Sequence, residues 1–468
     1  MSDRTPNTVR PLPYRVGRSA AISARRHRAA GVLLAFALIG GAGLLATSCQ
    51  SSRSTGTPAP SAPALVDESA WRVPPRLEGE PDIRVRLERD ATSVSITAPV
   101  AVLLDGSAYS TPLTIERGSV GWRVRSSDGR VRLVGGDART RTLTIADIDG
   151  SSSYEDPIVL DGTPLAGRVV LHARPRVSEG VFDVVEHVPM ETYVAGVISK
   201  ELFGGWSLTA FRAQAIAARS YALHEQARRQ RLGIHFDVAS TTADQVYAGL
   251  SNNPTALRAV HDTAGLALTW DGGVLRTYYS STCGGRSASA CETWRCDGEF
   301  AYNRAGPIQT SPRVDCCAAS PLFRWEVTRP RDALSRRIRA WGRAREHDVR
   351  NIKRVASVEV IERNAHDRPS RYRVTDDAGR SFELSPESLR VACNTGVRGL
   401  KNITRDTRVN SGDLDIEVRG RDVMLRGRGF GHGVGMCQYG AQGMSEMGID
   451  AYDILAHYYP GAEIERVY

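Results

Sequence analysis

The sequence predicts an α+β fold, in which a central Ala-rich helix packs on a mixed or antiparallel β-sheet, with β-rich accessory regions. Residues 207–223 place apolar side chains at helical spacing and include many small residues. Before and after this stretch, short alternating segments are separated by Asp-Gly and Gly-Gly turns, which is typical of antiparallel strands. A length of 468 residues with 41% apolar residues allows two or three domains.

The first 48 residues are typical of a secretory signal peptide. Arg25, Arg26 and Arg28 precede a short apolar run, 31–46, which ends in small residues. That run is shorter than the roughly 20 residues that span a bilayer. Because Cys49 follows directly, as in a bacterial lipobox, we expect an exported protein with a lipid anchor on Cys49, facing the periplasm or cell wall. An uncleaved signal anchor is the alternative.

Two regions of different composition follow the predicted signal peptide. Residues 49–80 are rich in Ser, Thr and Pro, so we predict a lipid-anchored disordered linker. Residues 81–180 contain several short alternating segments, which predict a β-rich accessory domain. Packing or glycan binding is its expected role, since nothing in it indicates chemistry.

The formal net charge of +9 argues against nucleic-acid binding once its distribution is considered. Residues 1–48 hold seven Arg and one Asp, which accounts for +6 of that charge. The later chain has no basic run interleaved with aromatic residues. We therefore predict that the protein binds no nucleic acid.

A single acid, Glu201, lies among apolar and aromatic residues just before the Ala-rich helix, for which Ser207 is the expected N-cap. Leu202, Phe203 and Trp206 flank the acid, and such surroundings disfavour the ionised carboxylate and raise its pKa. A carboxylic acid that stays protonated near neutral pH can act as a general acid. An exposed loop acid beside a core helix is the alternative.

Four stretches together carry a resemblance to a known family. They are VPMETYVAGVISKELFGGWSLTAFRAQAIAARSYAL at 188–223, STTADQVYAG at 240–249, TYYSSTCGGRSASACETW at 277–294 and GRGFGHGVGMCQYGAQGM at 427–444. In this order they resemble the core of the stage II sporulation protein D / amidase-enhancer (SpoIID/LytB) family. Glu201 falls on the catalytic glutamate of that family.

The resemblance implies a lytic transglycosylase that cleaves peptidoglycan glycan strands and leaves an anhydro-muramyl product. One glutamate serves as acid and base, whereas glycoside hydrolases need two carboxylates at a defined separation. The nearest second acid of the motif, Glu191, is expected on a different element from Glu201. Family members are similar in preferring denuded glycan, so a cell-wall amidase is a possible partner. A non-catalytic peptidoglycan-binding amidase enhancer and a structural envelope lipoprotein are the alternatives.

The same motifs supply the predicted substrate-binding residues. On the Ala-rich helix, Arg219 could instead pair with an acid and Gln214 could cap backbone. In the 277–294 stretch, paired glycines would let the backbone approach a ligand, and hydroxyls would suit a sugar; a tight β-turn is the alternative. The full set is Gln214, Arg219, Tyr221, Gln245, Tyr247, Ser280, Ser281, Thr282, Gly284, Gly285, His432, Gln438 and Tyr439.

His432 lies between alternate glycines in the closing motif. The spacing of these glycines differs from that of nucleotide-binding loops and suggests a flat strand against which a glycan or another backbone can lie. We expect His432 to bind substrate or orient Glu201; a structural histidine bonded to backbone is equally compatible.

Seven cysteines follow Cys49, and five of them are clustered. In an exported protein, disulfide bonding is the default. Some members of the family hold zinc near this motif through Cys and His, but no His lies between His261 and His347. We therefore predict disulfides, no metal and no cofactor. A thiol nucleophile at Cys283 is a minor alternative, with His432 as its only plausible base. The predicted disulfide set is Cys283, Cys291, Cys296, Cys316 and Cys317.

The remaining boundaries follow from the motifs. We predict a SpoIID-like core at 181–320, a β-rich insertion with one basic helix at 321–425, and the closing motif with a C-terminal helix and strand at 426–468. Residues 390–402 are expected to form a loop inside the insertion.

Overall fold

The computed structural model describes residues 76–135, 141–148, 154, 156–312 and 315–468. The predicted signal peptide, Cys49 and nearly all of the linker lie outside these residues. Within the described part, no helix has both the length and the apolar character needed to cross a membrane. Helices and mixed or antiparallel sheets occur together, which confirms the α+β prediction.

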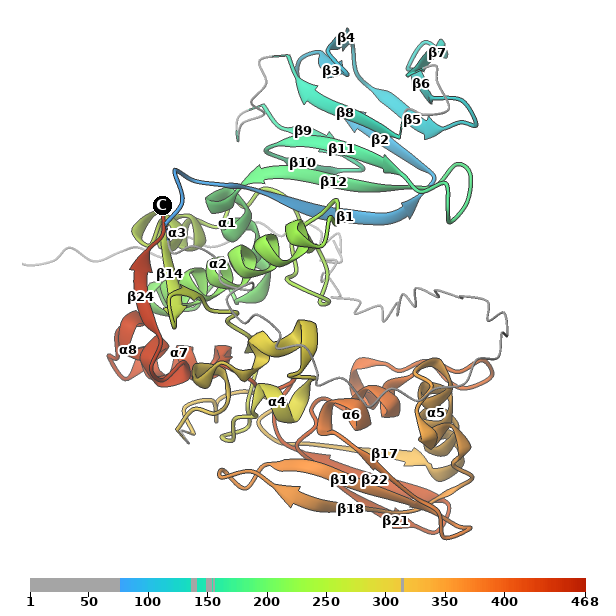
Figure 1. Cartoon of the computed structure of the whole chain (residues 1–468), viewed down its shortest axis with the longest axis vertical. Coiled ribbons are helices and arrows are strands. Elements are labelled where there is room, and N and C mark those ends of the chain that lie inside the picture. Colours follow the sequence, from blue (N-terminus) through green and yellow to red (C-terminus); the bar gives the residue numbers. More distant parts are fainter. Residues whose placement is uncertain (1–75, 136–140, 149–153, 155, 313–314) are drawn as a thin grey trace, which may run out of the picture. The chain divides into compact units, whose positions relative to one another are not determined.

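A β-sandwich occupies the N-terminal part of the described chain (Figure 1). One sheet has seven strands in the order β13-β1-β12-β11-β8-β3-β4, and the other has six in the order β10-β9-β2-β5-β6-β7. Alternate residues of both sheets are buried in one apolar cluster, as expected when two sheets pack face to face. The strands are β1 (Asp82–Ala91), β2 (Ser93–Thr97), β3 (Val102–Leu104), β4 (Ser107–Tyr109), β5 (Leu113–Arg117), β6 (Trp122–Ser126), β7 (Val131–Val134), β8 (Thr142–Asp147), β9 (Ile158–Leu160), β10 (Thr163–Leu165), β11 (Arg168–Ala173), β12 (Phe182–Pro189) and β13 (Val238–Ala239).

This sandwich continues past the predicted boundary at residue 180. β12 pairs with both β1 and β11, and it leads directly into α1 (Met190–Glu201). β13, which comes after the Ala-rich helix, adds a parallel strand to the edge of β1. The helical core therefore shares one sheet with the sandwich.

The Ala-rich helix is α2 (Leu208–Arg231), and it is the buried centre of the core (Figure 1). The side chain of Ser207 caps it by accepting a hydrogen bond from the Ala210 backbone N–H at 3.1 Å. Small residues on different faces, such as Ala218 and Ala217, belong to two separate apolar clusters. The helix is buried because these small side chains let neighbouring elements approach on both sides.

The remainder of the core surrounds α2 with short elements. β24 pairs with β14, and β23 pairs in parallel with β16, so C-terminal strands complete sheets begun much earlier in the chain. These elements are α3 (Pro254–Asp262), β14 (Leu266–Trp270), β15 (Gly273–Val274), β16 (Tyr279–Ser280), α4 (Ala290–Thr293), β23 (Met436–Cys437), α7 (Gln438–Glu446), α8 (Ala451–Tyr458) and β24 (Glu463–Arg466). Short 3-10 turns cover Gly298–Arg304 and Gly306–Ile308.

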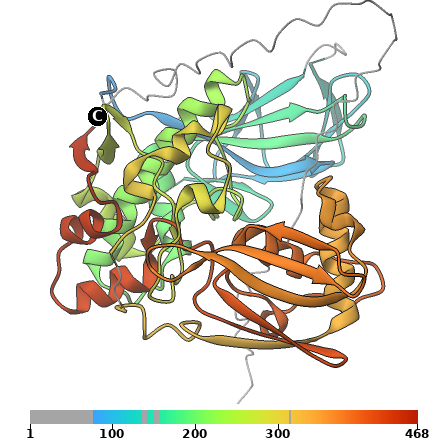
Figure 2. The same cartoon turned by 60° about the horizontal axis from the view of Figure 1, so that its bottom comes forward.

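The insertion has its own apolar cluster, built from two three-stranded sheets and two helices (Figure 2). Its helix α5 (Arg331–Ala344) confirms the predicted basic helix. Its other elements are β17 (Trp325–Pro330), β18 (Val355–Arg363), β19 (Pro369–Asp376), β20 (Ser381–Leu384), α6 (Pro386–Asn394), β21 (Leu414–Arg419) and β22 (Asp422–Gly427), with 3-10 turns at Asp348–Asn351 and Arg405–Thr407.

Two helices differ from the sequence expectation. α6 covers the start of the predicted loop at 390–402, because Ser385 caps it and Pro386 favours its first turn. α7, which contains two glycines, is not among the predicted helices; the sulfur of Cys437 accepts a hydrogen bond from the Gly440 backbone N–H at its start. α8 and β24 confirm the predicted C-terminal helix and strand.

The glycine-rich closing motif is not the flat strand that we predicted. Gly429, Gly431, Gly433 and Gly435 all have positive φ angles, between 66° and 101°. A Cβ atom at Gly435 would lie 2.0 Å from the Tyr278 carbonyl oxygen. The glycines therefore allow a winding backbone to contact other parts of the protein closely.

Candidate functional site

Glu201 is the last residue of α1; the residue is half-buried, and two hydrogen bonds hold its carboxyl group. The backbone N–H of Val246 donates to Oε1 at 3.1 Å, and Nε2 of Gln438 donates to Oε2 at 3.3 Å. Gln438 is the first residue of α7 and is itself buried. The structure thus brings the predicted acid together with one predicted substrate-binding residue.

Burial raises the pKa of Glu201 above the ordinary value of a glutamate, and the two hydrogen bonds act in the opposite direction. No charged group of the described residues contributes to this shift. The carboxyl group is therefore kept protonated to higher pH by its surroundings, as the apolar neighbours in the sequence predict.

A buried polar network lies next to this carboxyl. Nε2 of Gln245 donates to the Tyr279 hydroxyl at 3.0 Å and to the Ala218 carbonyl at 3.2 Å, while Oε1 accepts from the Tyr193 hydroxyl at 3.0 Å. Both tyrosines are close enough to Glu201 for its charge to raise their pKa values, after desolvation. Gln245 is therefore held at the site. Tyr279, which belongs to the 277–294 stretch, and Tyr193 are neighbours outside the predicted substrate-binding set.

Three aromatic rings form a rim beside Glu201. The ring centroids of Trp206 and Tyr439 are 4.9 Å apart, and those of Phe203 and Trp206 are 5.4 Å apart. Phe203 is 60% exposed, which is unusual for a large apolar side chain next to a buried core. Exposed aromatic faces are suitable for stacking on sugar rings. Only Tyr439 of this rim was predicted to bind substrate.

Glu191 is not on a different element, as we expected, but at the start of the same helix as Glu201. Ten residues of α-helix separate the two by about 15 Å, which exceeds the separation of paired carboxylates in glycosidases. Glu191 also forms an ion pair with Arg219, because its carboxylate accepts hydrogen bonds from Nε and Nη2 of Arg219 at 2.9 and 2.5 Å.

Arg219 is accordingly not brought to Glu201. Its side chain is fully buried, pairs with Glu191 and donates from Nη1 to the Leu266 carbonyl at 2.9 Å. The backbone N–H of Gly265 and the Tyr468 hydroxyl complete the shell of Glu191. The alternative that Arg219 pairs with an acid accounts for its position, and a substrate contact is not supported.

The other predicted residues near α2 are buried. Gln214 is fully enclosed, and neither polar atom of its side chain has a hydrogen-bond partner among the described residues. The Tyr221 hydroxyl donates to Asp244 at 3.1 Å and accepts from Arg276 at 3.0 Å. Tyr247 packs on Tyr193, with ring centroids 5.1 Å apart. Gln214 and Tyr247 have core positions, whereas Tyr221 lines a cleft.

The predicted stretch from Ser280 to Gly285 contacts other protein segments. The Ser281 carbonyl accepts from the Tyr439 backbone N–H at 3.0 Å, and the Thr282 hydroxyl lies 2.8 Å from that of Ser320. Ser280 is buried, with no partner for its hydroxyl among the described residues. At Gly284 and Gly285, an added Cβ would meet Arg428 at 2.6 Å and Asp315 at 2.1 Å. These glycines allow close approach of protein, which corrects our expectation of a ligand.

His432 lines a polar cleft of about 570 Å³ together with Tyr221, Tyr279, Trp294 and Glu387. Its Nδ1 accepts from the Val434 backbone N–H at 3.1 Å, and its ring lies 4.9 Å from that of Trp294. Burial lowers the pKa of His432 to about 4, so the ring is neutral at physiological pH. These contacts favour the structural alternative, and the described contacts do not join His432 to Glu201.

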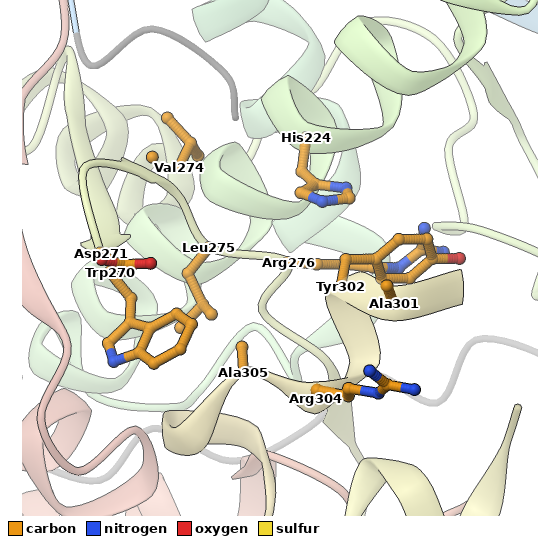
Figure 3. A pocket seen from close by; sticks show the side chains of 11 residues that line it. His224, Trp270, Asp271, Val274, Leu275, Arg276, Ala301, Tyr302, Arg304 and Ala305 are labelled. Carbon is orange, nitrogen blue, oxygen red and sulfur yellow. The ribbon is translucent and has the colours of Figure 1, made fainter. Parts of the chain in front are cut away.

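A smaller cavity of about 150 Å³ opens near the C-terminal half of α2 (Figure 3). His224 and Tyr302 lie against each other there, with ring centroids 5.0 Å apart, and Trp270 forms another part of the wall. None of the residues lining this cavity belongs to the predicted site.

Sequence reasoning also missed Arg368, which is 1% exposed and precedes β19 in the insertion. Its guanidinium donates to the carbonyls of Cys283, Arg286 and His432 at 3.2, 2.9 and 3.1 Å. Gly433 leaves room for this group, since a Cβ there would lie 2.8 Å from it. One arginine of the insertion thus binds both the 283–286 turn and the closing motif.

The predicted disulfides are absent from the structure. The seven described cysteines are all free thiols, including Cys283, Cys291, Cys296, Cys316 and Cys317. The Sγ atoms of Cys283 and Cys317 are 3.7 Å apart, which is longer than a disulfide bond, and the Sγ atom of Cys437 lies within 4.8 Å of both. Cys437 was outside the predicted set.

Comparison with known proteins supports the identity of this core. Residues 178–270, which contain Glu201, match the family model described as Stage II sporulation protein. The match covers this part of the chain and shows similarity to that family. Residues 315–435 match a domain of unknown function, DUF8618, which includes the predicted insertion. The resemblance to the SpoIID/LytB family is confirmed.

The similarity to known proteins covers more of this chain than residues 178–270. An uncharacterized protein of Brachyspira hyodysenteriae is 29% identical over 289 residues, which cover 60% of this chain and 68% of that protein. The amidase enhancer of Bacillus subtilis is 27% identical over 293 residues, 58% of this chain and 40% of the enhancer. Stage II sporulation protein D of Bacillus amyloliquefaciens is 27% identical over 302 residues, 60% of this chain and 76% of that protein.

Proposed function

We propose that this protein cleaves peptidoglycan glycan strands in the cell envelope by a lytic transglycosylase mechanism. The observation that carries the proposal is the carboxyl group of Glu201, which Val246 and Gln438 hold by hydrogen bonds. Its pKa is raised by burial, and no second carboxylate contributes to the shift among the described groups.

Glu201 would act twice in one turnover. Its protonated carboxyl group gives a proton to the glycosidic oxygen as the bond from that oxygen to C1 breaks. The resulting carboxylate then removes a proton from a hydroxyl of the same muramyl residue, whose oxygen bonds to C1 and closes the anhydro ring. Glu201 ends protonated, and no water is consumed.

The surroundings of Glu201 suit a polysaccharide. The rim of Phe203, Trp206 and Tyr439 offers aromatic faces beside the acid, and Gln438 keeps one carboxyl oxygen oriented. Orienting an acid by a fixed hydrogen bond reduces the conformational search before reaction. We propose denuded glycan as the substrate, with a cell-wall amidase as the enzyme that removes the stem peptides.

Incubation of the chain from Gln50 onward with denuded glycan strands tests this function. Mass spectrometry should find products that end in anhydro-muramyl residues, each lighter by one water than a hydrolysis product. Products carrying that water would identify a hydrolase instead, and intact glycan would exclude cleavage of this substrate.

A non-catalytic amidase enhancer is the second candidate. It is favoured by the similarity to the Bacillus subtilis amidase enhancer over 58% of this chain. A protein of this kind would accelerate peptide release by an added amidase and leave the glycan strands intact. Replacing Glu201 would then not affect the acceleration.

A further inference from the structure

Three thiols from distant parts of the chain meet in the core. The Sγ atoms of Cys283, Cys317 and Cys437 all lie within 4.8 Å of one another, and all three residues are buried. Cys283 follows β16, Cys317 precedes β17 of the insertion, and Cys437 ends β23. None of the three has a role in the proposed glycan chemistry.

The distance between the sulfur atoms distinguishes a disulfide bond from a shared metal ion. Cys283 and Cys317 have their Sγ atoms 3.7 Å apart, whereas a disulfide bond is about 2.05 Å long. Two sulfurs that bind one tetrahedral ion at about 2.3 Å lie about 3.8 Å apart. The observed distance therefore fits a common metal ion and not a covalent bond.

Backbone N–H groups point at one of these sulfurs. The N–H of Cys283 and that of Gly440 donate to Sγ of Cys437 at 3.2 and 3.3 Å. Such donors stabilise thiolate, which is the form of cysteine that binds metal.

Several thiolates in a buried site would repel one another unless a cation is bound. His, Asp and Glu side chains do not join the cluster among the described residues, so its donors are sulfur alone. Sulfur ligands select soft d¹⁰ ions, namely Zn²⁺ and Cu⁺.

We propose that Cys283, Cys317 and Cys437 bind one thiophilic d¹⁰ metal ion, Zn²⁺ or Cu⁺, as a structural site. Three sulfurs complete a trigonal shell for Cu⁺, whereas Zn²⁺ would take one further ligand, such as water. The ion would fasten the 282–285 turn to the insertion and to the start of α7.

The position of Cys437 gives the site a consequence for Glu201. Cys437 immediately precedes Gln438, whose Nε2 donates to the Glu201 carboxyl group. An ion on Cys437 would therefore fix the start of the helix that orients the acid. This consequence rests on the proposed function, but the metal site itself does not.

The test measures the metal content of the full chain, exported in metal-replete cells and purified without chelator. We expect one equivalent of zinc or copper by mass spectrometry, and the element found distinguishes the two ions. Cys437→Ser and Cys283→Ser should reduce the metal to background. Cys291→Ser is the matched control, because Cys291 lies outside the cluster, and it should keep one equivalent.

A second measurement uses the melting temperature of the wild-type protein, so it does not depend on whether the variants fold. Wild-type protein whose metal has been removed by a chelator should melt at a lower temperature and recover on adding one equivalent of the same ion. Cobalt substitution should give the intense thiolate charge-transfer absorption of a sulfur-ligated metal. Glu201→Gln should keep its metal, so failure of the proposed function and failure of the metal site can be told apart.

Three results would each overturn the site. One is wild-type protein without stoichiometric metal. Another is a peptide map, made without reduction, in which Cys283 is linked to Cys317. The third is a folded Cys437→Ser chain that keeps a full equivalent of the ion.

Discussion

The side-chain amide of Gln438 donates to the carboxyl group of Glu201 at 3.3 Å, across 237 positions of sequence. It joins the first residue of α7 to the last residue of α1. The closing motif of the chain is therefore part of the environment of the proposed catalytic acid.

Replacing Gln438 should shift the pH dependence of glycan cleavage. The hydrogen bond from its amide lowers the pKa of Glu201, so its removal should raise that pKa. Because the acid must be protonated to act, the alkaline limb of the pH–rate profile of Gln438→Ala should move to higher pH. Gln442→Ala is the control on the same helix, since the Gln442 side chain contacts Ser207 and Glu446 instead, and its profile should match that of the wild type.

The aromatic rim should contribute to substrate binding more than to chemistry. We expect Trp206→Ala to raise KM about 10-fold, equivalent to about 1.4 kcal/mol, with a smaller change in kcat. Trp270→Ala is the control, because Trp270 is 40% exposed and lines the other cavity. An unchanged KM in Trp206→Ala would remove the rim from the substrate site.

His432→Ala should reduce stability and leave the activity of the folded fraction intact. The truncation leaves the Val434 N–H without its acceptor, which costs about 1–3 kcal/mol, and removes the packing against Trp294. His432→Asn, whose side chain offers an oxygen acceptor, should restore part of the melting temperature. Loss of turnover without a thermal shift would instead return His432 to the active site.

Glu186 should make the protein less stable as the pH rises. It is fully buried, and burial raises its pKa to about 7. The stability contribution of this group is complete below its unfolded pKa of about 4.5 and is lost as the pH rises through about 7, with an upper bound of about 3 kcal/mol. Glu186→Gln should therefore unfold with a flatter pH dependence, measured in denaturant at pH 5 and pH 8 as the difference from wild type. Equal slopes for the two proteins would show that Glu186 is not protonated in the folded state.

Features that depend on neighbouring residues in the sequence could be predicted from the sequence alone. The apolar flanks of Glu201 predicted its raised pKa, and Ser207 predicted the start of α2. Periodicity likewise predicted α5 and the C-terminal helix and strand.

Contacts between residues far apart in the sequence could not be predicted from the local sequence pattern. Arg219 and Glu191 are 28 residues apart, and nothing in the spacing shows that they form an ion pair instead of a ligand contact. The convergence of Cys437 with Cys283 and Cys317 likewise depends on how β23 pairs with β16. The glycines of the closing motif have positive φ angles that their alternation did not reveal.

The central claim is that Glu201 performs the chemistry, and one comparison tests it most directly. Glu201→Gln and the surface control Glu463→Gln are incubated with denuded glycan strands under the same conditions as wild type. We expect the rate of anhydro-muramyl product formation to fall about 10²–10⁴-fold in Glu201→Gln, because the amide can neither give nor take the required proton, and to be unchanged in Glu463→Gln. Both chains should melt as cooperatively as wild type. A folded Glu201→Gln protein that releases anhydro-muramyl products at the wild-type rate would contradict the account.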